Sequence, residues 1–364
     1  MSFRTTISWL LFPLTMWYAV GTWFRNLLFD IGLKKQHAPH VTTIGVGNIC
    51  AGGTGKTPHA EYLLQMLSDR YRTAMLSRGY KRKSSGFVLD DGSHLASRLG
   101  DEPAMVAYKH PKVQVAVCEK RVVGIGKLME QSKPQVVVLD DVFQHRHIKP
   151  TISILLTEYG NPFYRDHVMP YGNLRESRSA RYRANIVIVT KSPAQLNPID
   201  RHNIVQELGL RPFQKVFFST IRYCDPVPLL GGKSLPLTDF DHVLLVTGIA
   251  HPESLQQHVA QSCQVTSLTF NDHHNYSNGD IKRIRKAFDQ MPGSRKVILT
   301  TEKDAARLRE MAGREVMAGL PIYALPIAVE ILPNKDYDFD QTILNLVNDN
   351  ILFLDKMSKT KFDW

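Results

Sequence analysis

Cysteine is scarce in this chain of 364 residues. The four thiols are scattered, and no two have the Cys-x-x-Cys spacing of a zinc or redox motif: Cys50, Cys118, Cys224 and Cys263. Scattered thiols argue against a disulfide framework and against structural zinc, and they favour a reducing compartment such as the cytosol. A chain of this length buries enough apolar surface to fold without such cross-links.

The sequence also has no internal repeat, no low-complexity tract and no RNA-binding signature, and it is short of acidic residues. Its 45 Lys and Arg outnumber 34 Asp and Glu, which gives a net charge of +11. This excess predicts an acidic partner, either nucleic acid, an anionic membrane or a phosphorylated substrate. Because no RNA-binding signature is present, we expect no nucleic-acid partner, and no obligate protein partner is evident.

A long uninterrupted hydrophobic run is missing as well. The apolar and aromatic stretch 7–24 is diluted by a proline, a glycine and hydroxyl residues, whereas a membrane span needs about 20 apolar residues. A signal peptide is not expected, since no small-residue cleavage site follows. The tryptophans favour the headgroup level of a bilayer, as do the flanking cations Arg25, Lys34 and Lys35. We therefore expect a membrane-surface helix within 1–36; the alternatives are a full span and a soluble helix packed on the protein.

The segment that follows, residues 41–57, reads VTTIGVGNICAGGTGKT. A β-branched run, a glycine-rich turn, Gly-Lys-Thr and a helical stretch together predict a phosphate-binding P-loop, whose backbone N–H groups cradle anionic oxygens. Lys56 would reach the β- and γ-phosphates of ATP, and the Thr57 hydroxyl would ligate Mg²⁺. Cys50 stands where the motif usually has its first glycine. The expected ATP-binding residues are Cys50, Ala51, Gly52, Gly53, Thr54, Gly55, Lys56 and Thr57.

Short apolar runs alternate with helical stretches along the rest of the chain. This alternation predicts an α/β fold, with a P-loop NTPase parallel sheet flanked by helices and a second, smaller α/β domain. Strands are expected at 41–47, 73–77, 113–118, 135–140, 152–157, 185–190 and 215–222, and then at 242–247, 264–270, 296–301 and 321–327. Helices are expected at 58–70, 101–109, 120–132, 176–183, 252–261, 278–290, 303–312 and 339–357. The domains would be 37–225 and 226–364, joined by a Pro/Gly-rich linker at 226–237, with the last helix folding back on the first domain.

Several acids follow or precede these elements. Asp140 and Asp141 end a buried strand, where a carboxylate holds Mg²⁺ or its water in nucleotide sites. Asp101 opens a helix, so it is either an N-cap or a carboxylate that accepts the proton of a substrate hydroxyl.

Basic and imidazole groups accompany the acids. Arg78 closes the second strand and could contact a phosphate, while Arg175, Arg178 and Arg181 would form one basic stripe if that segment is helical. The pair His273-His274 could bind a metal, but hydrogen bonding to an active-site acid is more plausible. In the next motif, Thr301 is a candidate helix cap and Lys303 a candidate for the same cleft.

Taken together, these motifs resemble the tetraacyldisaccharide 4′-kinase family of lipid A biosynthesis. The resemblance rests on seven segments spread from about residue 40 to 310: 47–58, 77–80, 100–103, 140–145, 174–176, 272–274 and 301–304. It implies transfer of the ATP γ-phosphoryl group to the 4′-hydroxyl of a lipid A disaccharide 1-phosphate. It also implies a location at the cytoplasmic face of the bacterial inner membrane, as a peripheral or monotopic protein.

The resemblance further implies roles for individual residues. Catalytic residues would be Lys56, Asp101 as the base, Asp141 and His273; Thr57, Asp140 and Asp141 would hold the metal; Arg78, Tyr80, Asn173, Arg175 and Glu176 would bind the substrate. The match leaves open which of Asp140 and Asp141 touches the metal, and it does not choose between His273 and His274.

Two other functions are compatible with a P-loop. One is an NTP-driven switch or metallochaperone-type NTPase at the membrane surface, although the Asn/Thr-Lys-x-Asp guanine motif of GTPases is not found at Thr190-Lys191-Ser192-Pro193. The other is a non-enzymatic membrane-docking module that binds nucleotide only structurally. A requirement for a lipid acceptor in nucleotide turnover separates the kinase from both.

Overall fold

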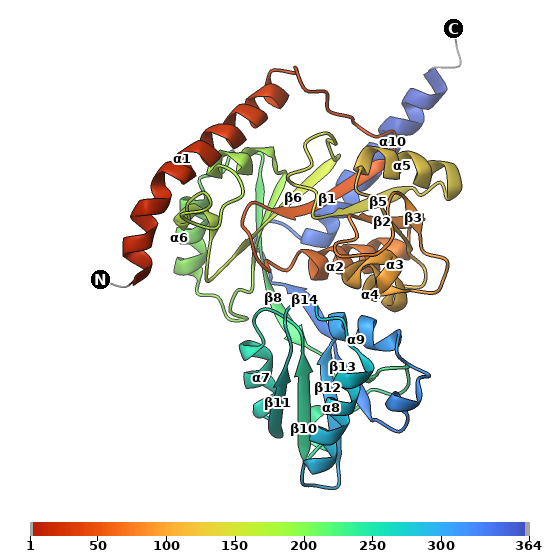
Figure 1. Ribbon diagram of the computed structural model, residues 1–364. Coiled ribbons are helices and arrows are strands. Elements are labelled where there is room, and N and C mark those ends of the chain that lie inside the picture. Colours follow the sequence, from red (N-terminus) through yellow and green to blue (C-terminus); the bar gives the residue numbers. More distant parts are fainter. Residues whose placement is uncertain (1–2, 361–364) are drawn as a thin grey trace. The chain divides into compact units, whose positions relative to one another are not determined.

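A computed structural model describes residues 3–360, with side chains described for 13–359. Residues 1–2 and 361–364, which belong to the two expected terminal segments, lie outside this range. The chain divides into two compact units (Figure 1). The first contains the chain up to Arg78, then Lys112–Ile221 and the chain from Val329; the second contains Gly79–Pro111 and Arg222–Ala328. Segment 79–111, which the expected boundaries placed in the first domain, goes with the second unit. The last helix, expected to fold back on the first domain, belongs to the first unit.

The first unit is built on a largely parallel sheet (Figure 1). Its strands lie in the order β14 (Ile327–Ile331), β8 (Lys215–Tyr223), β7 (Ile186–Thr190), β6 (Ile152–Glu158), β1 (Thr42–Asn48), β5 (Val136–Asp140), β2 (Thr73–Ser77) and β4 (Gln114–Val117). β1 is central and pairs in parallel with β5 on one side and β6 on the other. β1, β2, β5 and β7 are buried along their whole length, as expected where helices cover both faces of a parallel sheet. The expected fold class is therefore confirmed.

The helices of this unit are α1 (Phe3–Asp30), α2 (Lys56–Ser68), α5 (Arg121–Gln131), α6 (Pro198–Leu208) and α10 (Phe339–Thr360), with the short 3₁₀ helices η1 (Phe163–Arg165) and η2 (Arg178–Arg183). The sequence did not predict α6. The expected helix at 176–183 is wrong in type: only 178–183 is helical, and it is a 3₁₀ helix. Glu176 before it and Arg183 at its end are joined by an ion pair, which fixes both ends of this short segment.

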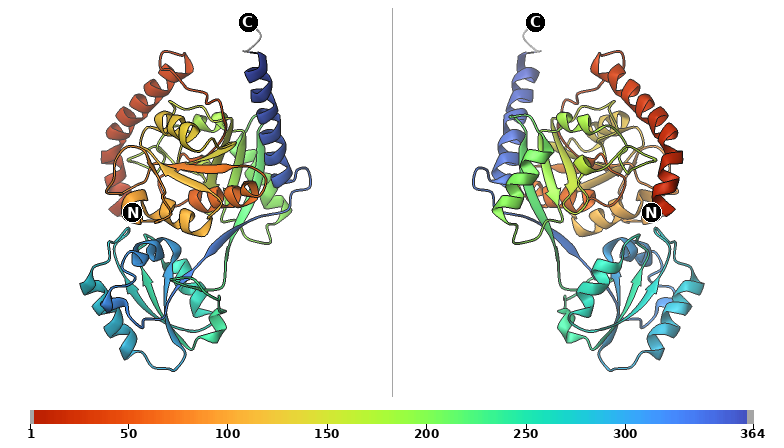
Figure 2. Two further views of the ribbon diagram at one scale, coloured as in Figure 1. Left: turned by 90° about the vertical axis from the view of Figure 1, so that its right-hand side faces the viewer. Right: turned by 90° about the vertical axis from the view of Figure 1, so that its left-hand side faces the viewer.

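α1 runs along one side of the first unit, and α10 lies on the opposite side (Figure 2). Hydrogen bonds join α1 to the body of the unit: Arg146 donates to the Asp30 carboxylate at 2.7 Å and to the Asn26 carbonyl at 2.9 Å. The ring of Phe29 is buried beside the same guanidinium. Across the described residues, the structure contains no helix whose length and apolar character would suffice to cross a bilayer.

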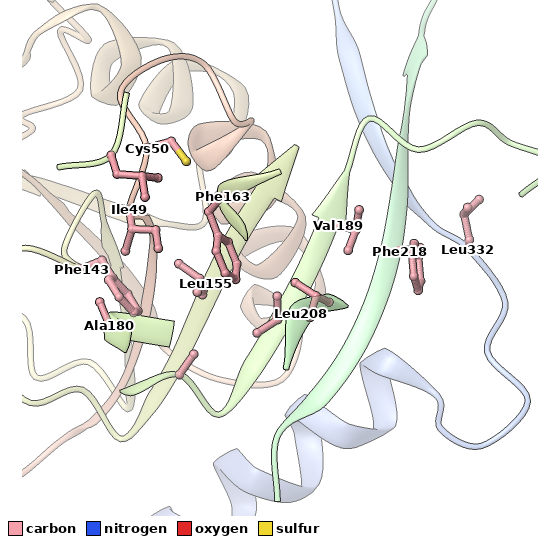
Figure 3. Close-up of a cluster of buried hydrophobic side chains, with 13 residues drawn as sticks. Ile49, Cys50, Phe143, Leu155, Phe163, Ala180, Val189, Leu208, Phe218 and Leu332 are labelled. Atoms are coloured by element: carbon pink, nitrogen blue, oxygen red, sulfur yellow. The ribbon is translucent and has the colours of Figure 1, made fainter. Parts of the chain in front are cut away.

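An apolar cluster fills one side of the sheet around β6, β7 and β8 (Figure 3). Its three phenylalanines are Phe143, Phe163 and Phe218, of which Phe163 and Phe218 are almost fully buried. The cluster extends to Ile49 and Cys50, the first two residues of the P-loop. Cys50 thus contributes apolar contact at a position where glycine is usual, and burial raises the pKa of its thiol to about 12.

The second unit has its own sheet, in the order β11 (Gln264–Thr269), β10 (His242–Thr247), β12 (Lys296–Thr301), β13 (Ile322–Leu325) and β9 (Val227–Pro228). Alternate residues of β10 face opposite sides: Leu244 and Val246 join one apolar cluster, and Val243 and Leu245 join the other. Two buried faces on one strand require helices on both sides of the sheet. β9 lies within the expected linker 226–237 and pairs antiparallel with β13.

The remaining elements of the second unit are α7 (Glu253–Ala260), α8 (Asn278–Gln290), α9 (Glu302–Arg309), η3 (Leu237–Asp239) and η4 (Glu315–Met317). Its segment 79–111 carries β3 (Val88–Leu89), α3 (Ala96–Leu99) and α4 (Asp101–Lys109). α4 makes its most extensive helix contact with α9, and Lys109 forms an ion pair with Glu302 at 2.8 Å. These contacts explain why 79–111 belongs with the later segment.

Candidate active site

The P-loop connects the central strand β1 to α2. A Cβ placed on Gly47 would lie 2.6 Å from the Cβ of Phe143, so only glycine lets the segment after β5 pack this closely on β1. Gly55 precedes α2 with φ +85°, and no side chain of the described chain caps the helix. A Cβ on Gly52 or Gly53 would meet no described atom within 4 Å. The loop therefore combines open space with uncapped N–H groups at a helix N-terminus, the arrangement that binds anions.

Side chains outside the loop hold it in place. Asn48 donates to the Thr54 hydroxyl at 2.8 Å, and the Thr190 hydroxyl donates to the Thr54 carbonyl at 3.0 Å. The Ala51 N–H donates to the carbonyl of Asn173 at 2.7 Å. Asn173, an expected substrate residue, thus supports the P-loop through its backbone.

Lys56 and Arg175 lie beside Asp141. Their nitrogens are 3.6 Å and 3.5 Å from the same carboxylate oxygen of Asp141, which are ion-pair rather than hydrogen-bond distances. Asp141 follows β5 with φ +47°, a conformation that is uncommon for non-glycine residues. The structure therefore brings Lys56 and Asp141, both expected at the phosphate and metal end of the site, together with Arg175, which was expected to bind the substrate.

Asp140 and Thr57 lie on the two neighbouring elements, β5 and α2, and both are buried. The strand register pairs Asp140 with Val46, two residues before the end of β1. The Arg121 guanidinium donates to the Asp140 carbonyl at 3.3 Å, and burial lowers the pKa of this guanidinium to about 10. Carboxylate and hydroxyl oxygens of this kind are the ligands that Mg²⁺ prefers.

Glu176 is 3% exposed and connects three parts of the first unit. Its carboxylate accepts from Arg183 at 2.8 Å and 2.9 Å, from Gln144 at 3.1 Å, and from Asn26 of α1 at 3.1 Å. Tyr18 of the same helix donates to the Arg175 carbonyl at 3.0 Å. α1 is thereby hydrogen-bonded to the segment that carries Arg175.

The expected basic stripe is not formed. Arg175 precedes η2 and faces Asp141, whereas Arg178 donates to the Asp166 carbonyl and Arg181 to the Gly209 carbonyl. Each guanidinium thus satisfies a different local acceptor. Arg78 is exposed at the end of β2, and its charge adds to burial and to the charge of Arg121 in lowering the pKa of His145.

A second cluster of charged groups lies within the second unit, at the start of α4. The ring Nδ1 of His273 and a guanidinium nitrogen of Arg307 each lie 2.8 Å from Oδ2 of Asp101. Burial by itself would raise the pKa of Asp101, but the bonds from His273 and Arg307 outweigh it and lower that pKa below its usual value. The helix is capped by Gly100 with φ +91°, so Asp101 is not the N-cap that its position suggested. The ring of the exposed Tyr80 meets that of His273 edge-on, with centroids 5.4 Å apart.

Arg307 is held in turn by Asp304, which is fully buried. The Asp304 carboxylate accepts from Arg307 at 3.1 Å, from the Gly248 N–H at 3.0 Å and from the Tyr276 hydroxyl at 3.2 Å. A relay of charged groups therefore runs from the core of the second unit to Asp101.

The neighbouring polar residues have different partners. His274 bonds to Asp280 at 3.1 Å, beside the capping box of α8, so of the two adjacent histidines only His273 contacts Asp101. Thr301 caps α9, as the sequence predicted. Lys303 forms an ion pair with Glu102, the residue next to Asp101.

Two participants were missed in the sequence. Arg307 follows Asp304 at i+3, a spacing that places both on one helix face and could have been noticed. Arg183 carries no such local signal, because a 3₁₀ segment separates it from its partner Glu176. Gln144 belongs to the motif at 140–145, but its bond to the distant Glu176 could not be predicted from the sequence.

Comparison with known proteins agrees with these motifs. Residues 7–348 match the protein family described as tetraacyldisaccharide-1-P 4′-kinase. The chain is 43% identical over 354 residues to a tetraacyldisaccharide 4′-kinase of Bacteroides thetaiotaomicron, with 93% of each chain covered. It is 42% identical over 342 residues to that of Flavobacterium psychrophilum, covering 93% of this chain and 96% of the relative. A crystal structure of LpxK from Aquifex aeolicus in complex with ATP superposes with a TM-score of 0.74 and 26% identity, covering 95% of this chain and 99% of that one.

Proposed function

The chain belongs to the tetraacyldisaccharide-1-P 4′-kinase family and is a lipid kinase of lipid A biosynthesis, and we propose how its residues divide the reaction. The P-loop holds ATP, Asp101 accepts the proton of the acceptor hydroxyl, and the γ-phosphoryl group passes to the 4′-hydroxyl of a lipid A disaccharide 1-phosphate. A P-loop switch or metallochaperone-type NTPase is not favoured, since the family match extends over nearly the whole chain.

The observation that carries the nucleotide assignment is the open loop at the uncapped end of α2, with Lys56 drawn to Asp141 only at ion-pair distance. At 3.6 Å this pair forms no hydrogen bond, so an incoming phosphate has little to displace. Lys56 would then pair with the β- and γ-phosphates, leaving Arg175 as the cation beside Asp141.

The oxygens that fit a magnesium ion are the Thr57 hydroxyl and the carboxylates of Asp140 and Asp141. When bound, the ion neutralises charge on the transferring phosphoryl group. We propose Asp140 as the main carboxylate, because it lies buried at the end of β5 in register with β1. Asp141 would orient Lys56 and Arg175, since its carboxylate lies beside both cations.

For the acceptor hydroxyl we propose Asp101 as the base and His273 as its positioning partner. The His273 ring and the Arg307 guanidinium both contact the same oxygen of Asp101, Oδ2, so we assign Oδ1 to the substrate. The lowered pKa keeps Asp101 ionised at neutral pH, the form that can accept a proton. His274 is not assigned a role, because it is engaged by Asp280.

At the substrate surface we propose direct contacts for Arg78 and Tyr80, both exposed. Asn173 and Glu176 would act by position, the first by supporting the P-loop and the second by holding Gln144 and α1. Arg175 belongs to the phosphate end of the site.

We also propose that α1 binds the surface of an anionic membrane, as a peripheral or monotopic element at the cytoplasmic face. Its solvent side presents large apolar residues, with Trp17 78% and Trp23 59% exposed. Several such residues on one helix are the usual mark of an interfacial element.

The decisive experiment combines ATP, Mg²⁺ and lipid A disaccharide 1-phosphate, with formation of the 4′-phosphorylated lipid as the readout. Lys56→Ala should lower turnover by about 10²-fold or more, because the compact cation at the β- and γ-phosphates is lost. Lys112→Ala is the matched control, since Lys112 is exposed and pairs only with the surface residue Asp69 among the described residues. Turnover like that of the wild type in Lys56→Ala would refute the P-loop assignment.

A further inference from the structure

His59, in the first turn of α2, joins the P-loop to β8 through hydrogen bonds of its ring. His59 is 3% exposed and contacts the loop on one side of its ring and β8 on the other. Its Nδ1 lies 2.7 Å from the Gly55 carbonyl oxygen, and its Nε2 lies 2.8 Å from the hydroxyl oxygen of Ser219. Because a carbonyl can only accept, Nδ1 carries the proton; in the neutral ring Nε2 then accepts from Ser219.

Burial keeps this ring neutral. Desolvation lowers the pKa of His59 to about 4, although its bond to the Gly55 carbonyl opposes that shift. A neutral imidazole adds no charge to the loop. Any effect of His59 on an anion in the loop is therefore geometric.

The geometry follows from the planar trans peptide. The carbonyl of one residue and the N–H of the next point in opposite directions. The Gly55 carbonyl accepts hydrogen bonds from the imidazole and from the backbone N–H of His59, so the Lys56 N–H points away from His59. The Thr54 carbonyl likewise accepts from the Thr190 hydroxyl, so the Gly55 N–H points away from Thr190. The N–H groups of Gly55 and Lys56 are thus oriented by the hydrogen bonds that the carbonyls of the same two peptides accept.

We propose that His59 and Ser219 together are positioning residues that fix the Gly55–Lys56 peptide and thereby set the affinity of the loop for the phosphates of ATP. The Gly55 carbonyl also accepts the His59 backbone N–H at 3.1 Å, so removal of the imidazole leaves this peptide held by that bond alone. Removal of the Ser219 hydroxyl leaves the imidazole itself less firmly oriented. In both cases more of the ordering of the loop has to occur when phosphate binds, which weakens binding. The proposal rests on the assignment of the P-loop as the nucleotide site.

Equilibrium binding of MgATP, measured without lipid acceptor, tests the proposal in the full-length protein. His59→Phe keeps a ring of similar volume but removes both bonds, and it should weaken ATP binding about tenfold, the equivalent of one well-formed hydrogen bond. Ser219→Ala should weaken it by about threefold, because it removes only the outer bond. His59→Asn retains a donor near the Nδ1 position and should fall between wild type and His59→Phe. His202→Phe, on the exposed side of α6, is the matched control.

Two further readouts separate positioning from general damage. Amide hydrogen exchange of residues 54–57 should accelerate in His59→Phe, while the KM for the lipid acceptor stays at its wild-type value. The double variant His59→Phe/Ser219→Ala should bind ATP no worse than His59→Phe, because both changes break one chain of bonds.

ATP affinity within twofold of wild type in both single variants would overturn the proposal, as would fully additive losses in the double variant. If His59→Phe does not fold, Ser219→Ala and its exchange data decide the question, because that change deletes only one hydroxyl. Lys56→Ala separates the assignment of the P-loop as the nucleotide site from the positioning role of His59 and Ser219. If it binds ATP normally, the P-loop assignment fails; if it binds weakly while the His59 and Ser219 variants bind normally, only the positioning role fails.

Discussion

The neighbours of Asp101 determine which role its carboxylate can have. The sequence offered two roles for it, helix cap or base, and the structure gives the cap to Gly100 and surrounds Asp101 with His273 and Arg307. Asp101→Asn keeps the shape but cannot accept a proton. We expect the turnover number to fall by about 10²-fold or more, together with a loss of about 1–3 kcal/mol in stability, since buried Arg307 loses one of its two carboxylates.

The control for this experiment is Asp280→Asn, the same substitution at the neighbouring His274–Asp280 pair. It removes a histidine contact and weakens the cap of α8, so it should cost about 1 kcal/mol of stability without reducing turnover. Activity should be measured well below both thermal midpoints. Full turnover by Asp101→Asn would show that the base lies elsewhere, and equal losses in the two variants would point to stability alone.

Two histidines make the stability of the first unit depend on pH. Burial lowers the pKa of His59 to about 4, and burial with the charges of Arg121 and Arg78 lowers that of His145 to about 4. The unfolded chain binds these protons near pH 6.5, whereas the folded chain does not, so stability is complete above pH 6.5 and declines as the pH falls toward 4. Each group contributes at most about 1.4 kcal/mol per pH unit within that window.

Thermal midpoints recorded between pH 7.5 and 5 should therefore fall for the wild type. The slope should become shallower in His145→Asn and in His59→Asn, because each substitution removes one titrating group. A slope that neither substitution changes would show that other groups govern the acid side of the stability curve.

At the scale of single elements, α1 has two distinct faces. One face is hydrogen-bonded to Gln144, Arg175 and Glu176 through Arg25, Tyr18 and Asn26. The other presents Trp17 and Trp23 to solvent. We expect membrane binding and the order of the site to depend on different residues of one helix.

The double variant Trp17→Ala/Trp23→Ala should bind anionic vesicles less tightly, by about tenfold or more, because two large interfacial rings are lost. Its thermal midpoint should stay within 1–2 °C of wild type, roughly what surface substitutions produce. Phe213→Ala, an exposed aromatic elsewhere in the first unit, is the control. Unchanged vesicle cosedimentation of the tryptophan variant would place the membrane contact on another surface.

The elements themselves were largely predictable from local pattern. β1, the P-loop and α2 follow from a β-branched run, clustered glycines and Gly-Lys-Thr, all adjacent in the chain. The apolar run at 243–246 likewise predicts a strand, and the structure shows that both of its faces are buried. Composition and motif spacing indicated a nucleotide-binding protein with an acidic partner. Only the family resemblance indicated the reaction itself.

The remaining features depend on contacts between distant segments. Nothing near 79–111 indicates that it packs with α9, because the ion pair of Lys109 with Glu302 joins residues far apart in sequence. The periodicity at 176–183 suits an α-helix, and only the buried partners of Glu176 show why a 3₁₀ turn forms instead. The pair His59–Ser219 was invisible for the same reason, since an isolated histidine in a helix carries no signal of its partner.

At the scale of the whole molecule, the net charge of +11 should make membrane binding sensitive to ionic strength. Lysine and arginine near an anionic surface contribute about 1 kcal/mol each at low salt, and the Debye length shrinks to about 3 Å at 1 M salt. Cosedimentation with vesicles containing anionic lipid should therefore decrease from 0.05 to 0.5 M NaCl. Binding to neutral vesicles should change little, and equal salt dependence on both lipids would contradict an electrostatic contribution.

The way the chain alternates between its two units also sets an order of events during synthesis. It leaves the first unit at Arg78 and Ile221 and returns at Lys112 and Val329. The ribosome must therefore complete the second unit before it supplies β14 and the buried residues of α10, such as Ile343 and Val347. At about 5–20 residues per second, the nascent P-loop unit waits roughly five to twenty seconds with the outer side of β8 unpaired. The unpaired strand edge during translation is thus a consequence of connectivity, and a circular permutant that begins at Pro326, just before β14, should shorten that wait.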